Sequence, residues 1–199
     1  MARIRSRWHN KSAPKSIETI AGVAGMNIWK MASGSATKMY NEGFNFKNNA
    51  QLIEFISELA IFLLQLADRK AYEMVDDEQR GRFTQALAKH LINTVVENQV
   101  EELKGDPATY RSAIVEKLNH HLEGYAEFSA TNGEPSYPML RYFGTLAEQV
   151  MGGSDNKWVI EHVMEVEAPV LVKQLKEGLQ KLLPQAQSSE EDAETAESS

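Results

Sequence analysis

The stretch LIEFISELAIFLLQLA, Leu52 to Ala67, is the most apolar part of this chain and decides its fold class. A helix that crosses a membrane needs about 20 mostly apolar residues, and one carboxylate at its centre costs a few kcal/mol. This stretch is only 16 residues long and contains Glu54 and Glu58, so we expect a core helix instead. Its apolar residues cover most of the circumference of a helix, which predicts a central position in a helical bundle.

The helix around this stretch is predicted to run from Ala50 to Val75, with Asn48 as its N-cap and Gln51 in capping-box spacing. Apolar residues at three- and four-residue steps predict four more helices after it. A carboxylate at Asp76 or Asp77 caps the first of these, and Asp106 followed by Pro107 opens the second. The predicted ranges are Asp77–Leu103, Pro107 to about Ala130, Pro138–Met151 and Asp155–Leu183, with a loop at Thr131–Ser136. Because Pro169 lies inside the last helix, a kink is predicted there.

A weaker helix is predicted before the bundle, with Ser16 as its cap. Gly22 and Gly25 destabilise it by roughly 1 kcal/mol each relative to alanine, so it needs a surface to pack on. That surface is the protein's own bundle, another protomer or protein partner, or an anionic membrane. The apolar face is narrow and gives the candidate partner-binding residues Ile17, Ile20, Ala21, Ala24, Ile28 and Met31. We interpret Gly34 to Asn49 as a linker to the bundle.

The charge of the chain is unevenly distributed. Residues 1–38 carry a net charge of +6, residues 39–184 carry −8, and residues 185–199 carry −5. The acidic end has no large apolar residue and a run of like charge, which predicts a disordered tail. We therefore divide the chain into a basic arm with its helix and linker (1–47), a bundle domain (48–184) and an acidic tail (185–199).

The basic arm carries the candidate contacts to an anionic surface. Cations at the start of the chain, with one tryptophan among them, suit lipid headgroups, although interfacial helices usually have bulkier apolar faces than this one. Nucleic acid is not expected as a partner, because the body of the chain is acidic and repels a polyanion. The candidate anionic-surface contacts are Arg3, Arg5, Arg7, Trp8, Lys11 and Lys15.

The search for catalytic and metal-binding motifs is negative. The chain has no cysteine, which excludes disulfides, thiol catalysis and zinc–thiolate sites. It contains no Gly-x-Ser-x-Gly, no Walker-type loop and no Glu-x-x-His pair of the kind that builds di-metal sites. His120 with Glu123 is the nearest approach to such a pair, and we interpret it as solvated. We therefore expect no catalytic residue, metal or cofactor.

Asp68 follows the most apolar part of the central helix. We predict that it pairs with a cation of the next helix, Arg80 or Arg82, and that this pair fixes helix register rather than chemistry.

The sequence thus predicts an all-α fold: an antiparallel bundle of about five helices, a marginal amphipathic N-terminal helix and a disordered C-terminal tail. We expect a non-enzymatic protein-interaction or oligomerisation module. A peripheral membrane protein held by the basic N-terminal segment is the alternative, and a helical enzyme with a site assembled across helices is the third hypothesis. Because the first residues lack the uninterrupted apolar core of a signal peptide, a cytoplasmic location is expected.

Overall fold

The computed structural model describes residues 15–152 and 156–183. The described chain is an all-α bundle, which confirms the predicted fold class. The expected acidic tail, and all the proposed anionic-surface contacts except Lys15, lie outside the described residues.

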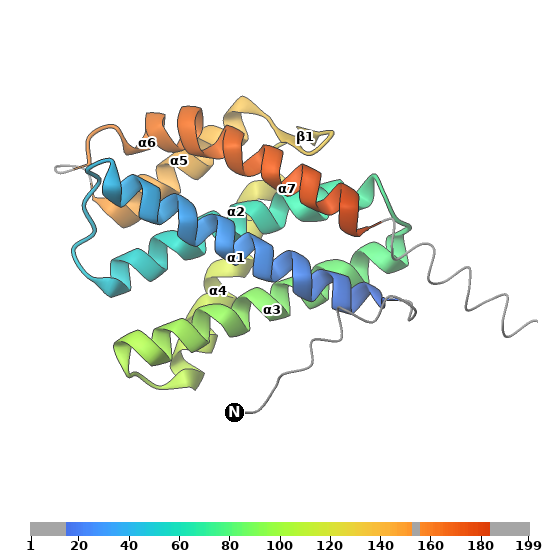
Figure 1. Ribbon diagram of the computed structural model, residues 1–199, viewed down its shortest axis with the longest axis horizontal. Coiled ribbons are helices and arrows are strands. Elements are labelled where there is room, and N and C mark those ends of the chain that lie inside the picture. The colour runs from blue at the N-terminus through green and yellow to red at the C-terminus, as the bar shows by residue number, and fades with distance from the viewer. Residues whose placement is uncertain (1–14, 153–155, 184–199) are drawn as a thin grey trace, which may run out of the picture.

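The helices follow one another with short connections. Their bounds are α1 Ile17–Asn41, α2 Asn49–Tyr72, α3 Asp77–Leu103, α4 Pro107–Ala126, α5 Tyr137–Met151, α6 Val159–His162, the π-helix η2 Val163–Glu167 and α7 Ala168–Leu182. In Figure 1, α1 crosses the front of the bundle between α7 and α3, and it contacts both of them.

Helix α2 is the centre of the bundle, as its apolar circumference predicts. It contacts α1, α3, α4, α5 and α7. Phe55, Phe62 and Leu63 are fully buried, and the rings of Phe62 and Phe143 of α5 stack with their centroids 4.3 Å apart. Within the described residues, α2 is the only helix long and apolar enough to cross a membrane, and 72% of its most apolar window is buried. That burial is typical of a core helix.

Four of the predicted N-caps are confirmed. The backbone N–H of Gln51 donates to Asn48 Oδ1 at 2.9 Å, and the N–H of Thr109 donates to Asp106 Oδ2 at 2.8 Å. Asp76 accepts from the N–H of Gln79, and Ser16 accepts from that of Thr19. These bonds satisfy donors that the first turn of a helix leaves unpaired.

The segment predicted as a loop at Thr131–Ser136 contains a small hairpin. Strands β1 Ala130–Thr131 and β2 Glu134–Pro135 pair in antiparallel register around Asn132 and Gly133, whose φ angles are 54° and 69°. Two consecutive left-handed residues match the type I′ turn that an Asn-Gly pair favours.

The predicted linker was wrong over its first half, because α1 continues to Asn41. Ala36 and Met39 extend the buried face past Gly34, so packing keeps this part helical. Gly25 explains how α1 fits against α3: a Cβ there would lie 2.5 Å from His90 Cδ2. The glycine lowers the intrinsic stability of the helix, but it permits the close approach of α1 and α3.

A kink was predicted at Pro169, and the structure instead has a π-helix directly before it. Residues 163–167 adopt π-helical hydrogen bonding, and α7 begins with Ala168 and Pro169 at its first positions. Proline is tolerated there because the first turn of a helix needs no N–H from it.

Candidate functional site

A buried carboxylate, Glu58, lies in the middle of the most apolar helix. Its neighbours come from α4, where Lys117 and His121 are four residues apart and so share a helix face. Lys117 Nζ lies 2.6 Å from Glu58 Oε1 and also pairs with Glu54, one turn earlier on α2. His121 Nε2 lies 2.8 Å from Glu58 Oε2. We call Glu54, Glu58, Lys117 and His121 the Glu58 cluster.

Several polar atoms of this region are buried without a well-directed hydrogen bond. The side chains of Glu58 and His121 are only 3% and 8% exposed. Their contact has the distance of an ion pair but not the angle of a hydrogen bond, and His121 Nδ1 has no partner among the described residues. Gln99 Oε1 and Tyr125 Oη are also buried without a hydrogen-bond partner among the described residues. Each such atom costs about 1–3 kcal/mol when nothing satisfies it.

The charge state of Glu58 follows from its neighbours. Burial acts to raise its pKa, but the contact with His121 and the positive charge of Lys117 outweigh it and lower the pKa below its ordinary value. Burial and the negative charge of Glu58 raise the pKa of Tyr125 well above its usual value, so the phenol stays neutral. The cluster therefore holds an ionised carboxylate inside the bundle at neutral pH.

A cavity of about 630 Å³ opens beside the Glu58 cluster, between α2, α3, α4 and α5. All four residues of the cluster contribute to its wall, together with the amide side chains of Gln51, Gln99 and Gln149. Its remaining lining is apolar and consists of Ala50, Leu103, Leu146 and Val150. The cavity thus combines charged and amide groups with aliphatic wall.

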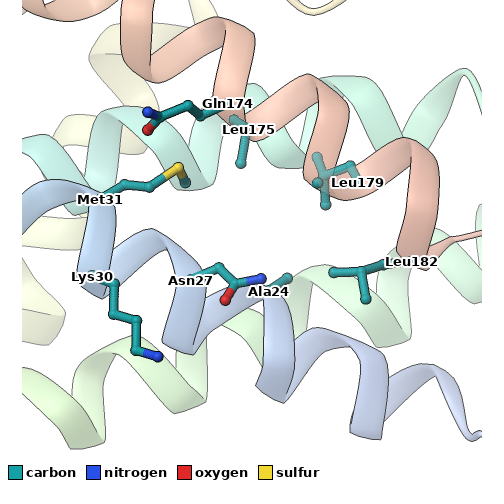
Figure 2. Close-up of a pocket in the computed structure, with 9 residues that line it drawn as sticks. Ala24, Asn27, Lys30, Met31, Gln174, Leu175, Leu179 and Leu182 are labelled. Atoms are coloured by element: carbon teal, nitrogen blue, oxygen red, sulfur yellow. The ribbon is translucent and has the colours of Figure 1, made fainter.

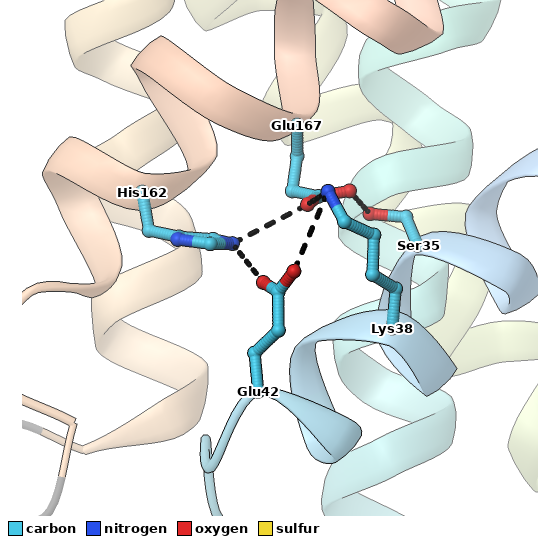
Figure 3. Close-up of polar contacts among 5 residues, drawn as sticks. All are labelled: Ser35, Lys38, Glu42, His162 and Glu167. Carbon is cyan, nitrogen blue, oxygen red and sulfur yellow. Dashed lines mark hydrogen bonds and ion pairs between the residues drawn. The ribbon is translucent and has the colours of Figure 1, made fainter.

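A second buried carboxylate, Glu167, ends the π-helix. Ser35 Oγ donates to its Oε2 at 2.7 Å, and Lys38 Nζ lies 2.7 Å from its Oε1. His162 Nε2 lies 3.3 Å from Glu167 Oε1 and 3.1 Å from Glu42 Oε2. Figure 3 shows these five side chains converging from the end of α1 and from the segment before α7.

The geometry of this second group also fits a cation. One ligand atom each from Glu42, His162 and Glu167 lie within 4.8 Å of one another. However, the ammonium group of Lys38 already lies between the two carboxylates, 2.7 Å from Glu167 and 3.8 Å from Glu42. Burial acts to raise the pKa of Glu167, but the hydrogen bonds from Lys38 and Ser35 outweigh it and lower the pKa. We therefore interpret this group, the Glu167 cluster, as an ion-paired clamp between α1 and the π-helix.

An apolar groove of about 260 Å³ separates α1 from α7. In Figure 2 Met31 faces Leu175 near one end of it, while Ala24 and Leu182 lie at the other. Lys30 is the one charged residue among those of the described chain that line it.

The structure places the predicted partner-binding face mostly inside the protein's own bundle. Five of its six residues are at most 2% exposed, namely Ile17, Ile20, Ala21, Ala24 and Ile28. Met31 is partly buried and lines the α1–α7 groove, as does Ala24. Of the three surfaces considered for this face, it therefore packs on the protein's own bundle. Lys15 is partly buried just before α1.

Of the polar interactions considered in the sequence, one is confirmed in detail. Arg80 Nε donates to Asp68 Oδ1 at 2.9 Å, which joins α2 to α3 as predicted. His120 and Glu123 are exposed, which agrees with a solvated pair. The histidine of α4 that contacts Glu58 is instead His121, which the sequence pattern did not single out. The signals for it were its three-residue step from Leu118 and four-residue step to Tyr125, both buried.

Comparison with known protein families, with curated proteins and with solved structures finds no match to this chain.

Proposed function

We propose that this chain is a non-enzymatic binding protein whose cavity beside the Glu58 cluster holds a small polar molecule. The observation that carries the proposal is the mixed wall of this cavity, where the charged side chains of the Glu58 cluster lie beside three glutamines and four apolar residues. Such a wall offers polar contacts to one part of a small molecule and apolar contacts to the rest.

The size of the cavity supports the same proposal. Small-molecule sites are typically about 300–1000 Å³ and combine apolar walls with a few convergent polar groups. The cavity has about 630 Å³ and both kinds of wall.

Binding fits the electrostatics better than proton transfer. A general acid or base works best when its pKa lies near the working pH. Lys117 and His121 lower the pKa of Glu58 instead, which favours a permanently charged anchor.

The test is isothermal titration of the full chain with small amines, amides, alcohols and carboxylates, followed by NMR mapping of the perturbed residues. We expect at least one class to bind and to perturb residues of α2, α3 and α4 around the cavity. The variant Gln99→Leu should weaken that binding about tenfold, because it removes a lining acceptor. Gln85→Leu, exposed on the same helix, is the matched control. If no class binds, or if both variants act alike, the proposal is wrong.

The α1–α7 groove favours a second candidate function, the interaction module expected from the sequence. Helical partners bind such grooves through apolar side chains at three- and four-residue steps. Lys30 lines the groove, and Lys173 and Lys181 of α7 are next in sequence to residues that line it. The one acidic residue of α7 is Glu177, so positive charge predominates along this side. We therefore propose that its occupant is an amphipathic helix of a partner protein with acidic side chains. Residues 184–199 lack the large apolar side chains that would fill the groove, and residues 1–14 are basic.

The groove can be blocked without disturbing the fold. A Cβ added at Gly178 meets nothing within 4 Å, so Gly178→Phe should fill the groove, while Gly22→Phe on α1 is the matched control. A photo-crosslinker at Asn27 should capture an acidic amphipathic segment, whose synthetic peptide should bind the wild type and Gly22→Phe but not Gly178→Phe. A crosslink to a second copy, a basic segment, or equal binding by both variants would contradict this candidate.

A further inference from the structure

The two helices that form the α1–α7 groove continue beyond its lining residues. We infer that the binding surface of the groove extends over Gly34 and Val170, which we call the groove extension, and that it takes a partner helix with four apolar anchors. This inference rests on the proposed interaction with an acidic amphipathic helix, and it adds the length of that helix and the spacing of its anchors.

The place of the groove extension follows from the contacts between the two helices. Figure 2 shows Met31 facing Leu175 near one end of the groove. Further along α1, the Glu167 cluster joins this helix to the π-helix that directly precedes α7. Gly34 and Val170 therefore lie between the Met31 end of the groove and the Glu167 cluster.

Both residues belong to helix faces that border the groove. Residues three or four apart on a helix share a face. Gly34 follows Met31 by three residues, and Val170 precedes Gln174 by four, and both of these neighbours line the groove. Val170 is 49% exposed, and a Cβ added at the exposed Gly34 would meet nothing within 4 Å. The extension therefore offers an apolar side chain on α7 and open space on α1.

Distances along α7 set the form of the partner. At the rise of an α-helix, Leu175 to Leu182 spans about 10 Å and Val170 to Leu182 spans about 18 Å. Anchors at i, i+4 and i+7 of a docked helix cover the shorter distance, and a further anchor at i+11 is needed to reach Val170. The partner segment is therefore about three turns long.

Lysines accompany the extension as they do the groove. Lys173 is exposed three residues after Val170, and Lys30 is exposed four residues before Gly34. Ion pairs at such exposed positions add little affinity, but they favour an acidic partner helix over a basic one.

The probe is a capped synthetic helix of alanine and glutamate with leucine at the four anchor positions, titrated calorimetrically into the full chain. We expect Val170→Ser to bind it about fivefold more weakly than wild type, because about half of the valine surface is available to the peptide. The matched control is Val115→Ser, at an exposed valine of α4 outside the groove lining, which should bind as wild type does. Circular dichroism verifies that both variants are folded.

Two altered peptides locate the fourth anchor. The anchor pattern has the same spacing in both directions, so glutamine replaces the leucine at one end in the first peptide and at the other end in the second. One of the two should bind wild type and Val170→Ser equally, which places its missing leucine at Val170. A four-leucine peptide with lysine instead of glutamate should bind wild type more weakly than the glutamate peptide.

The outcomes separate this inference from the groove function it rests on. Equal binding of the four-leucine peptide by wild type and Val170→Ser, with loss of binding in Gly178→Phe, would overturn the extension and leave the groove function standing. A response of both glutamine peptides to Val170→Ser would also overturn the fourth anchor. Binding by Gly178→Phe as tight as by wild type, a preference for the lysine peptide, or failure of every peptide would overturn both.

Discussion

Two buried glutamates in this bundle have similar partners and different surroundings. Glu58 and Glu167 each contact one lysine and one histidine. Around Glu167, both oxygens accept hydrogen bonds, from Ser35 and Lys38. Around Glu58, one oxygen and the facing histidine lack directed bonds, and a large cavity adjoins them.

The difference teaches how a structural ion pair can be told from a ligand site. A buried charge is maintained at low cost only when geometry and hydrogen bonds compensate its lost hydration. The Glu167 cluster is close to that condition and joins α1 to the π-helix. The Glu58 cluster falls short of it and borders a cavity, which is why we propose a binding function there.

The largest predicted effect is the loss of Glu58. In Glu58→Ala, Lys117 and His121 lose their carboxylate while their side chains are only 17% and 8% exposed. Breaking such a buried pair costs about 3–5 kcal/mol. Urea unfolding followed by circular dichroism measures it, with Glu123→Ala as the control expected within about 0.5 kcal/mol of wild type. A cost below about 1 kcal/mol would mean that the cluster is solvated.

The loss of Glu167 is predicted to have a smaller effect. In Glu167→Ala the stranded cation is Lys38, whose side chain is 45% exposed and so can turn to water. The remaining cost is that of unsatisfied partners at Ser35 and His162, about 1–3 kcal/mol. The same unfolding experiment compares the two variants directly. If Glu167→Ala costs more than Glu58→Ala, then the clamp, rather than the cavity wall, holds the less compensated charge.

The fold was predicted in more detail than the site, for physical reasons. Apolar period and capping residues are local signals, so the position of α2, the cap at Asn48 and the pair Asp68–Arg80 could be inferred. The continuation of α1 past Gly34 could not, because it depends on the cover that the bundle gives to Ala36 and Met39.

The site was missed because it depends on the rotation of one helix against another. Glu58 was noticed as an argument against a membrane span, but the residue that neutralises it lies 59 positions away, on α4. His120 and His121 are adjacent in sequence, and only the packing of α4 on α2 decides which ring is buried. Pro169 predicted a kink, but it did not predict the π-helix that brings Glu167 to Ser35.

A gain of stability is predicted for Tyr125→Phe. The hydroxyl group of Tyr125 is buried without a hydrogen-bond partner among the described residues, while its ring packs on Phe62 and Tyr142. Removing the hydroxyl keeps the ring contacts and relieves an unsatisfied group, so the variant should be more stable by about 1 kcal/mol. Thermal unfolding measures it, and the half-buried Tyr142→Phe should change less. A loss of stability would show that the hydroxyl has a partner, such as water, in solution.

The smallest predicted effect is a change in the pH dependence of stability when either glutamate is replaced. Both have a pKa below the ordinary value of 4.5, so the unfolded chain binds more protons than the folded one as the pH falls past that value. Their stabilisation is therefore fully present above about pH 4.5 and is lost as the pH falls through the folded pKa of each group. Below pH 4.5, the free energy of unfolding should change less steeply with pH in Glu58→Gln than in wild type. The same is expected of Glu167→Gln. A wild-type slope in both variants would contradict this prediction.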